Sequence, residues 1–213
     1  MKTEELVDML STDVSPVERH TVTWTIGIAI ATGSVFAIGG MLVIFGVRGD
    51  LTTGLALAYM LVKLAFALAI IALASIYLTR LARPGGESKT NAAAIMAPFA
   101  IIVLLAAISV SLAPGSHWNK MVAGTDWLEC ALSIPIIAVV PFAVVIWAVR
   151  KTAPTNLVRT GAVAGLVAGG ISALGYALHC TDDSLPFVAV WYGGTIALCT
   201  LAGAMFGPRL LRW

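Results

Sequence analysis

The sequence predicts an all-α protein that crosses a lipid bilayer six times, with both chain termini on the same side. Three observations lead to this prediction: the composition, the length of six apolar segments, and the distribution of positive charge between them. Of the 213 residues, 59% are hydrophobic and 11% are charged, and the mean hydropathy is +0.95. A soluble domain carries roughly 25% charged residues. So few charges do not cover a water-facing surface, and we therefore expect the bilayer to be the solvent.

Six segments are long enough to cross a bilayer, because a spanning helix needs about 20 mostly apolar residues. The segments are continuously apolar rather than alternating, which argues against spanning strands. The expected spans cover residues 22–45, 55–78, 92–113, 131–149, 158–178 and 186–206. They form a transmembrane domain over residues 22–206, with an N-terminal tail over residues 1–21 and a short C-terminal end over residues 207–213.

Lysine and arginine are distributed unevenly between alternate connecting segments. Of the thirteen, ten lie on the side of the termini, whereas Arg48 and Lys120 lie on the other side and Lys63 lies inside a span. Positively charged loops are retained in the cytoplasm. Both termini are therefore expected to be cytoplasmic, and the segments 48–54, 114–130 and 179–185 are expected to face outward.

The outward segments contain two cysteines, Cys130 and Cys180, at the outer ends of different helices. Imidazole and carboxylate groups lie near them in the sequence: His117, Glu129, His179 and Asp182. Thiols in an oxidising compartment form disulfides, and thiols with imidazoles and carboxylates bind zinc or copper. The sequence leaves three alternatives for these cysteines: a permanent disulfide, two inert thiols, or a reactive or metal-binding pair. We favour the reactive or metal-binding pair. Cys199, deep in the last span, is expected to be a small apolar core residue.

Lys63 is the one ionisable residue well inside an expected span. Such residues are functional candidates by default. Lys63 lies about two helical turns, roughly 12 Å, from the outer end of its helix. We expect its side chain to reach the interface or to make a polar contact within the bundle. No second charge inside the membrane is expected to pair with it, which argues against an ion or proton pathway.

Small residues recur at every fourth position of the fifth span, at Gly161, Gly165 and Gly169, and Ala173 and Ala177 continue the row. Such a row lets a neighbouring helix backbone approach closely. It predicts either packing against another helix of the same chain or a homodimer interface, and we favour the former.

The N-terminal tail is expected to begin with a short amphipathic helix, capped by Thr3 and with acidic residues in its first turn. The candidate partner-binding residues are Glu4, Glu5, Leu6, Asp8, Met9 and Leu10. An acidic tail binds anionic lipid poorly. It suits a basic groove on a protein partner that itself binds nucleic acid, although a frayed terminus without a partner is the alternative. No direct contact of this chain with nucleic acid is expected.

Several short motifs, taken in order, resemble the NrsF family of bacterial membrane anti-sigma factors. The resemblance covers essentially the whole chain and depends on the order of the motifs and on the two cysteine positions. The motifs are residues 2–10 followed by Pro16-Val17, Trp127 and Cys130, residues 153–155 followed by the glycine row, residues 176–180, residues 187–192, and residues 207–213.

The resemblance implies a multi-pass protein of the bacterial inner membrane that holds an extracytoplasmic-function sigma factor away from RNA polymerase, and not an enzyme. It implies that Cys130 and Cys180 sense heavy-metal or oxidative stress, with a transient heavy-metal ion at the two thiols as the one expected ligand. The sigma factor would bind the N-terminal tail and the cytoplasmic loops. Cys199 is additional to the implied cysteine pair.

Two other function classes fit the sequence less well. A quinone-linked thiol oxidoreductase needs a close cysteine pair such as Cys-x-x-Cys, and the sequence contains none. A small transporter needs intramembrane polar residues or broken helices in matching halves, and Lys63 alone does not meet that need.

Overall fold

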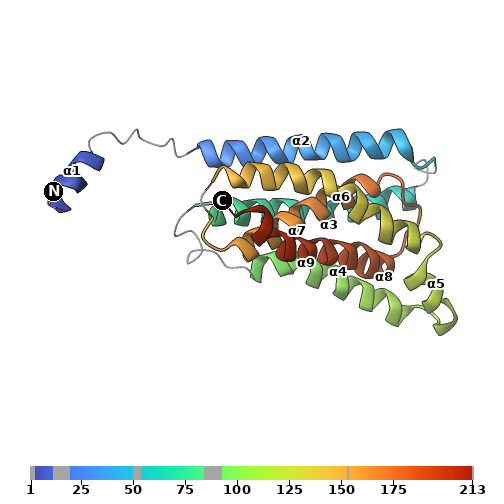
Figure 1. Cartoon of the computed structure of the whole chain (residues 1–213). Helices are drawn as coiled ribbons and strands as arrows, with labels where there is room; N and C mark the ends of the chain where they lie inside the picture. The colour runs from blue at the N-terminus through green and yellow to red at the C-terminus, as the bar shows by residue number, and fades with distance from the viewer. Residues whose placement is uncertain (1–2, 12–19, 50–53, 84–92, 153, 213) are drawn as a thin grey trace.

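The computed structural model describes residues 3–11, 20–49, 54–83, 93–152 and 154–212. Every regular element within these residues is a helix. Six long helical segments lie side by side, and short helices occupy one end of the resulting bundle (Figure 1). All six segments are long and apolar enough to cross a membrane. The prediction of an all-helical protein with six helices able to span a membrane is therefore confirmed.

The helices have the following bounds. The first three spans are α2 (Thr21–Ile44), α3 (Gly54–Leu81) and α4 (Ala93–Leu112). The fourth span is α6 (Trp127–Arg150), preceded by η2 (Gly115–His117) and α5 (Trp118–Ala123). The fifth is α7 (Leu157–Tyr176), and the sixth joins α8 (Leu185–Phe187), a π-helical turn η3 (Val188–Tyr192) and α9 (Gly193–Leu210). The predicted span boundaries differ from these by four residues at most.

The start of α2 and the end of α9 lie at one end of the bundle, which we call the terminal end (Figure 1). The opposite end, which we call the thiol end, contains Arg48, the turn between α5 and α6, and the segment 177–184. An even number of spans brings both termini to the same end. The charge distribution still predicts that the terminal end is cytoplasmic, although Lys2, Arg19 and Lys89 lie outside the described residues.

The described part of the N-terminal tail includes the helix α1 (Thr3–Ser11), with Glu4 and Glu5 in its first turn. The side chains of Val7 and Met9 are 60% and 61% exposed. Three of the predicted partner-binding side chains lie outside the part that the structure describes, namely those of Leu6, Asp8 and Leu10. The predicted short helix is present.

The most buried helix is α7, which packs against α2, α3, α6 and α9. Three of its glycines, Gly161, Gly165 and Gly169, face α9 at close distance. A Cβ atom on Gly161 would lie 2.3 Å from the Gly203 carbonyl oxygen, and one on Gly165 would lie 2.2 Å from the Cys199 carbonyl oxygen. Only glycine permits such an approach. The small-residue row therefore packs within the chain, as we favoured, and Gly203 and Gly207 complete the contact from α9.

The sixth span is interrupted by the π-helical turn η3. A π-helical turn shifts the backbone hydrogen bonds by one residue and leaves nearby carbonyls in need of another donor. The Thr195 hydroxyl lies 2.6 Å from the Trp191 carbonyl oxygen and 3.1 Å from that of Tyr192, and can donate to either. The Trp191 indole N–H donates to the Val122 carbonyl at 2.9 Å, which ties this span to α5.

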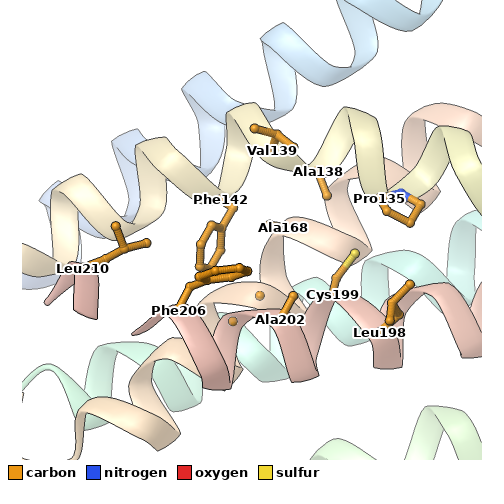
Figure 2. Close-up of a pocket in the computed structure, with 12 residues that line it drawn as sticks. Pro135, Ala138, Val139, Phe142, Ala168, Leu198, Cys199, Ala202, Phe206 and Leu210 are labelled. Atoms are coloured by element: carbon orange, nitrogen blue, oxygen red, sulfur yellow. The ribbon is translucent and has the colours of Figure 1, made fainter. Parts of the chain in front are cut away.

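An apolar pocket of about 410 Å³ lies between α6, α7 and α9 (Figure 2). Its lining includes Pro135, Phe142 and Phe206, together with Cys199. Apolar side chains of this kind suit lipid acyl chains. Cys199 is 8% exposed and packs against Gly169 of α7, which agrees with its predicted place in the core.

Candidate functional site

The thiol end brings Cys130 and Cys180 into one buried cluster. Cys130 lies in the first turn of α6, and Cys180 lies four residues beyond the end of α7. Their exposed fractions are 0% and 1%, they belong to the same hydrophobic core, and their thiols are close enough to interact electrostatically. Both are free cysteines. Two residues 50 positions apart in the sequence therefore share one site.

Two buried tyrosines surround these thiols. The rings of Tyr176 and Tyr192 lie 6.1 Å apart, both side chains are fully buried, and neither hydroxyl meets hydrogen-bond geometry with another described residue. The Tyr192 hydroxyl nevertheless lies beside the Cys180 thiol. We call Cys130, Cys180, Tyr176 and Tyr192 the thiol cluster.

The environment of Cys180 keeps its thiol protonated. Burial raises the pKa of Cys180, and the nearby Lys63 charge opposes this rise only in part. The thiolate is the reactive form of cysteine. Burial therefore lowers the reactivity of Cys180, and an oxidant or a metal reaches this thiol only if its exposure changes.

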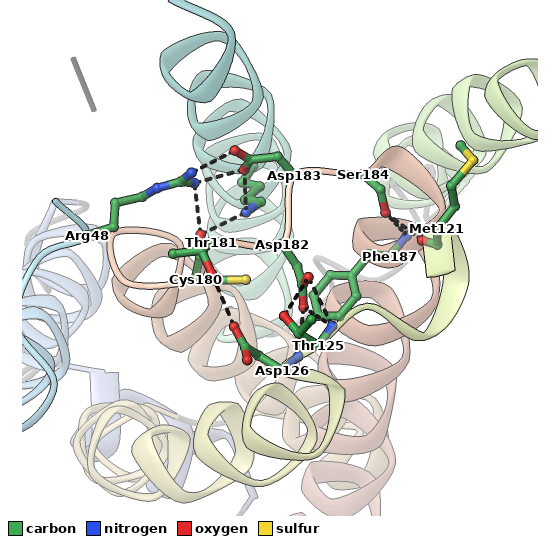
Figure 3. A network of polar contacts seen from close by, with 11 residues as sticks. Arg48, Met121, Thr125, Asp126, Cys180, Thr181, Asp182, Asp183, Ser184 and Phe187 are labelled. Carbon is green, nitrogen blue, oxygen red and sulfur yellow. Dashed lines mark hydrogen bonds and ion pairs between the residues drawn. The ribbon is translucent and has the colours of Figure 1, made fainter. Parts of the chain in front are cut away.

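A second cluster of charged residues holds the segment that carries Cys180 (Figure 3). The Arg48 guanidinium donates two hydrogen bonds to Asp183, at 2.8 Å to Oδ1 and 2.6 Å to Oδ2. The Lys63 ammonium donates to Asp183 Oδ1 at 3.1 Å. Both cationic side chains are fully buried, whereas that of Asp183 is 20% exposed. We call these three side chains the Asp183 cluster.

The same two cations bind the backbone of Cys180. Arg48 Nη1 and Lys63 Nζ donate to the Cys180 carbonyl at 2.9 and 3.0 Å. Burial alone would raise the pKa of Asp183, but the Arg48 hydrogen bonds and the Lys63 charge outweigh it and hold that pKa below the usual value for aspartate. Asp183 is therefore ionised at neutral pH and offsets the buried positive charge.

Asp182 attaches the same segment to α6 on its other side. Its carboxylate accepts hydrogen bonds from the backbone N–H groups of Thr125 and Asp126, at 3.0 and 2.9 Å, and from the Thr125 hydroxyl (Figure 3). Gly124, with a φ of +64°, makes this turn possible, because a Cβ atom there would lie 2.5 Å from Asp182 Oδ2. Asp182 thus has a structural role at the start of α6.

The remaining predicted neighbours lie in two places. His179 Nε2 lies 3.6 Å from Glu129 Oε1, and its ring lies 6.1 Å from that of Tyr176, so this pair is beside the thiol cluster. His117 is exposed and lines a polar pocket of about 350 Å³ with Asp182. Neither cysteine lines that pocket. Across the described residues, no three His, Cys, Asp or Glu side chains are grouped to hold a metal ion.

The expected polar contact of Lys63 within the bundle is confirmed. Its charged partner is Asp183, which belongs to the connecting segment 177–184 rather than to another span. The sequence could not show this contact, since Asp183 lies 120 positions away. The available signal was the pair Asp182-Asp183, which begins two residues after Cys180. For Arg48 the sequence showed only that it is one of two cations in the segments expected to face outward, and gave no sign of its contact with Asp183.

The sequence matches the family model described as "Negative regulator of sigma F" over residues 10–213. Two curated relatives align over the full length of both chains. They are "Probable anti-sigma-F factor NrsF" of Azospira oryzae, 32% identical, and "Anti-sigma-F factor NrsF" of Caulobacter vibrioides, 28% identical. No solved structure gives a significant match. The order of motifs, the six spans and these alignments agree, and the chain belongs to the NrsF family of negative regulators of sigma F.

Proposed function

We propose that this chain is an anti-sigma factor of the bacterial inner membrane that holds an extracytoplasmic-function sigma factor and releases it under periplasmic oxidative or heavy-metal stress. The observation that carries the proposal is the thiol cluster. Cys130 and Cys180 come from different elements and are buried together at the end opposite the termini. The names of the two full-length relatives support the regulatory role.

The charge distribution supports the orientation that this function needs. The described Lys and Arg residues at the terminal end include Arg83, Arg150 and Arg209, and positive charge favours the cytoplasmic side. The thiol end then faces the periplasm, where thiols are readily oxidised. The N-terminal tail faces the compartment that contains sigma factors.

The tail helix α1 supports a direct contact with the partner. Glu4 and Glu5 lie in its first turn, and Val7 and Met9 expose apolar surface. Short amphipathic helices of this kind bind in grooves on a partner protein. The cytoplasmic loops between spans supply further contacts in this proposal, because a nine-residue helix offers little surface.

The helices provide a connection between the two ends. Oxidation of Cys130 and Cys180, or metal capture by them, changes how α6 packs against the segment after α7. The stress signal shifts the equilibrium toward release of the partner. The size of this shift is limited by how much more strongly the signal stabilises the releasing state than the holding state. Buried Lys63 has a structural partner in Asp183, so it does not favour a transporter over this function.

The thiol trigger is tested with Cys130→Ser and Cys180→Ser in cells that carry a sigma-dependent reporter gene. We expect both variants to lose induction by a heavy-metal salt or peroxide. The matched control is Cys199→Ser, because Cys199 is also buried but lies in α9, outside the thiol cluster. Unchanged induction in both variants would refute the thiol trigger.

The partner is tested by capture from solubilised membranes with the full chain and with a chain that lacks residues 1–20. Mass spectrometry should identify a sigma factor with the full chain and a reduced amount with the truncated chain. The absence of any sigma factor from the full-chain sample would contradict the proposed partner.

A further inference from the structure

The segment 177–184, which connects α7 to α8, is held by residues from other parts of the chain. Arg48, which follows α2, and Lys63, in α3, both donate to the Cys180 carbonyl. The Arg48 backbone N–H also donates to the Leu178 carbonyl at 3.1 Å. The backbone that carries the Cys180 thiol is therefore attached to α2 and α3.

Asp183 supplies the negative charge that this attachment needs. Its carboxylate accepts two hydrogen bonds from Arg48 and one from Lys63. Removing one partner from a buried ion pair leaves an uncompensated charge. Without Asp183, the fully buried Arg48 and Lys63 side chains would lose the carboxylate that both of them bind beside the Cys180 carbonyl. Asp183 therefore acts on the position of the Cys180 backbone indirectly. Its carboxylate binds Arg48 and Lys63, and these two side chains bind the Cys180 carbonyl.

Cys130 is held by different contacts. Its backbone N–H donates to the Asp126 carbonyl at 2.9 Å, within the first turn of α6. The start of α6 is fixed in turn by Asp182, which accepts from the Asp126 N–H. Loss of the Asp183 cluster would therefore act first on Cys180 and leave Cys130 attached to its helix.

We propose that the Asp183 cluster controls the reactivity of Cys180 by holding its backbone so that the thiol stays buried. When Asp183 bridges Arg48 and Lys63, the thiol is covered, and when the bridge opens, the thiol becomes accessible. A buried group reacts only through local opening, and the hydrogen bonds and ion pairs that must break for this opening determine how often it occurs. Arg48, Lys63 and Asp183 are positioning residues. The inference rests on the proposed function for its biological role, since a sensor thiol has to be covered at rest and reachable under stress.

The test uses the full chain in membrane vesicles with Cys199→Ala, so that only the two cysteines of the thiol cluster react. N-ethylmaleimide, a small uncharged reagent, labels the vesicles for increasing times, and mass spectrometry measures the rate at Cys180 and Cys130 separately. The variants are Asp183→Asn and Lys63→Met. Lys63→Met removes one buried charge and keeps the paired Arg48 and Asp183, so it tests the inference without leaving an unpaired cation.

We expect Asp183→Asn to label Cys180 about tenfold faster or more, because the closed form no longer has its charge-assisted hydrogen bonds. Lys63→Met should give a smaller increase, since Arg48 still binds the Cys180 carbonyl. The control Glu129→Gln removes a carboxylate at the same end that is 42% exposed, and should stay within about twofold of the parent.

The ratio between the two cysteines separates positioning from general destabilisation. An increase confined mainly to Cys180 supports the inference, because global unfolding would expose Cys130 equally. Equal acceleration of both thiols, or unchanged rates in Asp183→Asn and Lys63→Met, would overturn it. The labelling needs no sigma factor. Failure of Cys130→Ser and Cys180→Ser to alter reporter induction would contradict the proposed function and leave the labelling result intact.

Discussion

Replacing Gly161 with alanine tests whether the backbone contact between α7 and α9 stabilises the bundle. The added Cβ atom would lie 2.3 Å from the Gly203 carbonyl oxygen and 2.6 Å from the Gly207 Cα atom. Ordinary contacts begin near 3.4 Å, so the two helices have to separate by about 1 Å at this point. The neighbouring atoms belong to the backbone and cannot rotate away.

The magnitude follows from two opposing effects. Inserting a carbon atom into a closely packed contact costs about 1–3 kcal/mol. Alanine recovers up to about 1 kcal/mol through its better helix propensity. Because the neighbouring backbone atoms cannot move aside, the cost lies in the upper part of its range, about 2–3 kcal/mol. After the gain from helix propensity, we expect the free energy of unfolding to fall by about 1–2 kcal/mol.

The assay is thermal unfolding in detergent, followed with a dye that becomes fluorescent on reaction with thiols. The dye reports unfolding because Cys130, Cys180 and Cys199 are all buried. The unfolding temperature should fall by about 2–4 °C for each kcal/mol of stability removed. The matched control is Gly194→Ala on α9, where the added atom meets nothing within 4 Å. Equal unfolding temperatures for the two variants would refute this account of the contact.

Three further predictions concern the thiol end. Because the pKa of Asp183 is lowered in the folded state, its stabilising effect is complete above the usual aspartate pKa and is lost as the pH falls through the lower folded value. The unfolding temperature should therefore fall more steeply below about pH 4 in the parent than in Asp183→Asn, and parallel curves would contradict this. Gly124→Ala should lose about 1–2 kcal/mol from its left-handed backbone alone, and more from contact with Asp182. Gly46→Ala, with a φ of +75° but open space, is the comparison, and an equal loss would exclude the steric contribution. Trp191→Phe should lose about 0.5–1.5 kcal/mol and speed hydrogen exchange in α5, whereas unchanged exchange would show that the indole hydrogen bond is unimportant.

The spans could be predicted because membrane crossing depends on a local property of the chain. A helix that satisfies its own backbone needs only a sufficient run of apolar residues. The fourth span shows the limit of this reasoning. We expected it at residues 131–149, but α6 begins at Trp127. Its extra turn is stabilised by Asp182, far away in the sequence, and places Cys130 inside the helix.

The glycine row could be recognised from its spacing, but its partner could not. A four-residue repeat shows that one face of the fifth span is small. It does not show which helix covers that face, because Gly203 and Gly207 lie more than 40 positions away from Gly161. A second row with the same spacing in the last span was the available signal.

For the candidate site, too, one part could be predicted from the sequence and another part could not. The sequence alone identified two cysteines at the same end of the bundle, because charge sorting and span counting assign each loop to one side. Tertiary structure alone brought them into one buried cluster with two tyrosines. It also paired Lys63 with Asp183, a contact that the sequence could not show because the two residues are 120 positions apart.

Six apolar spans, an acidic N-terminal tail and the family were thus determined by the sequence itself. Hydropathy, local charge and motif order can each be evaluated without knowing how the helices pack. The burial of Cys180 and its attachment through Arg48, Lys63 and Asp183 were decided only by the tertiary structure. The physical reason is that a buried charge is stable only beside its counter-charge. That pairing depends on the packing of α2 and α3 against the segment after α7.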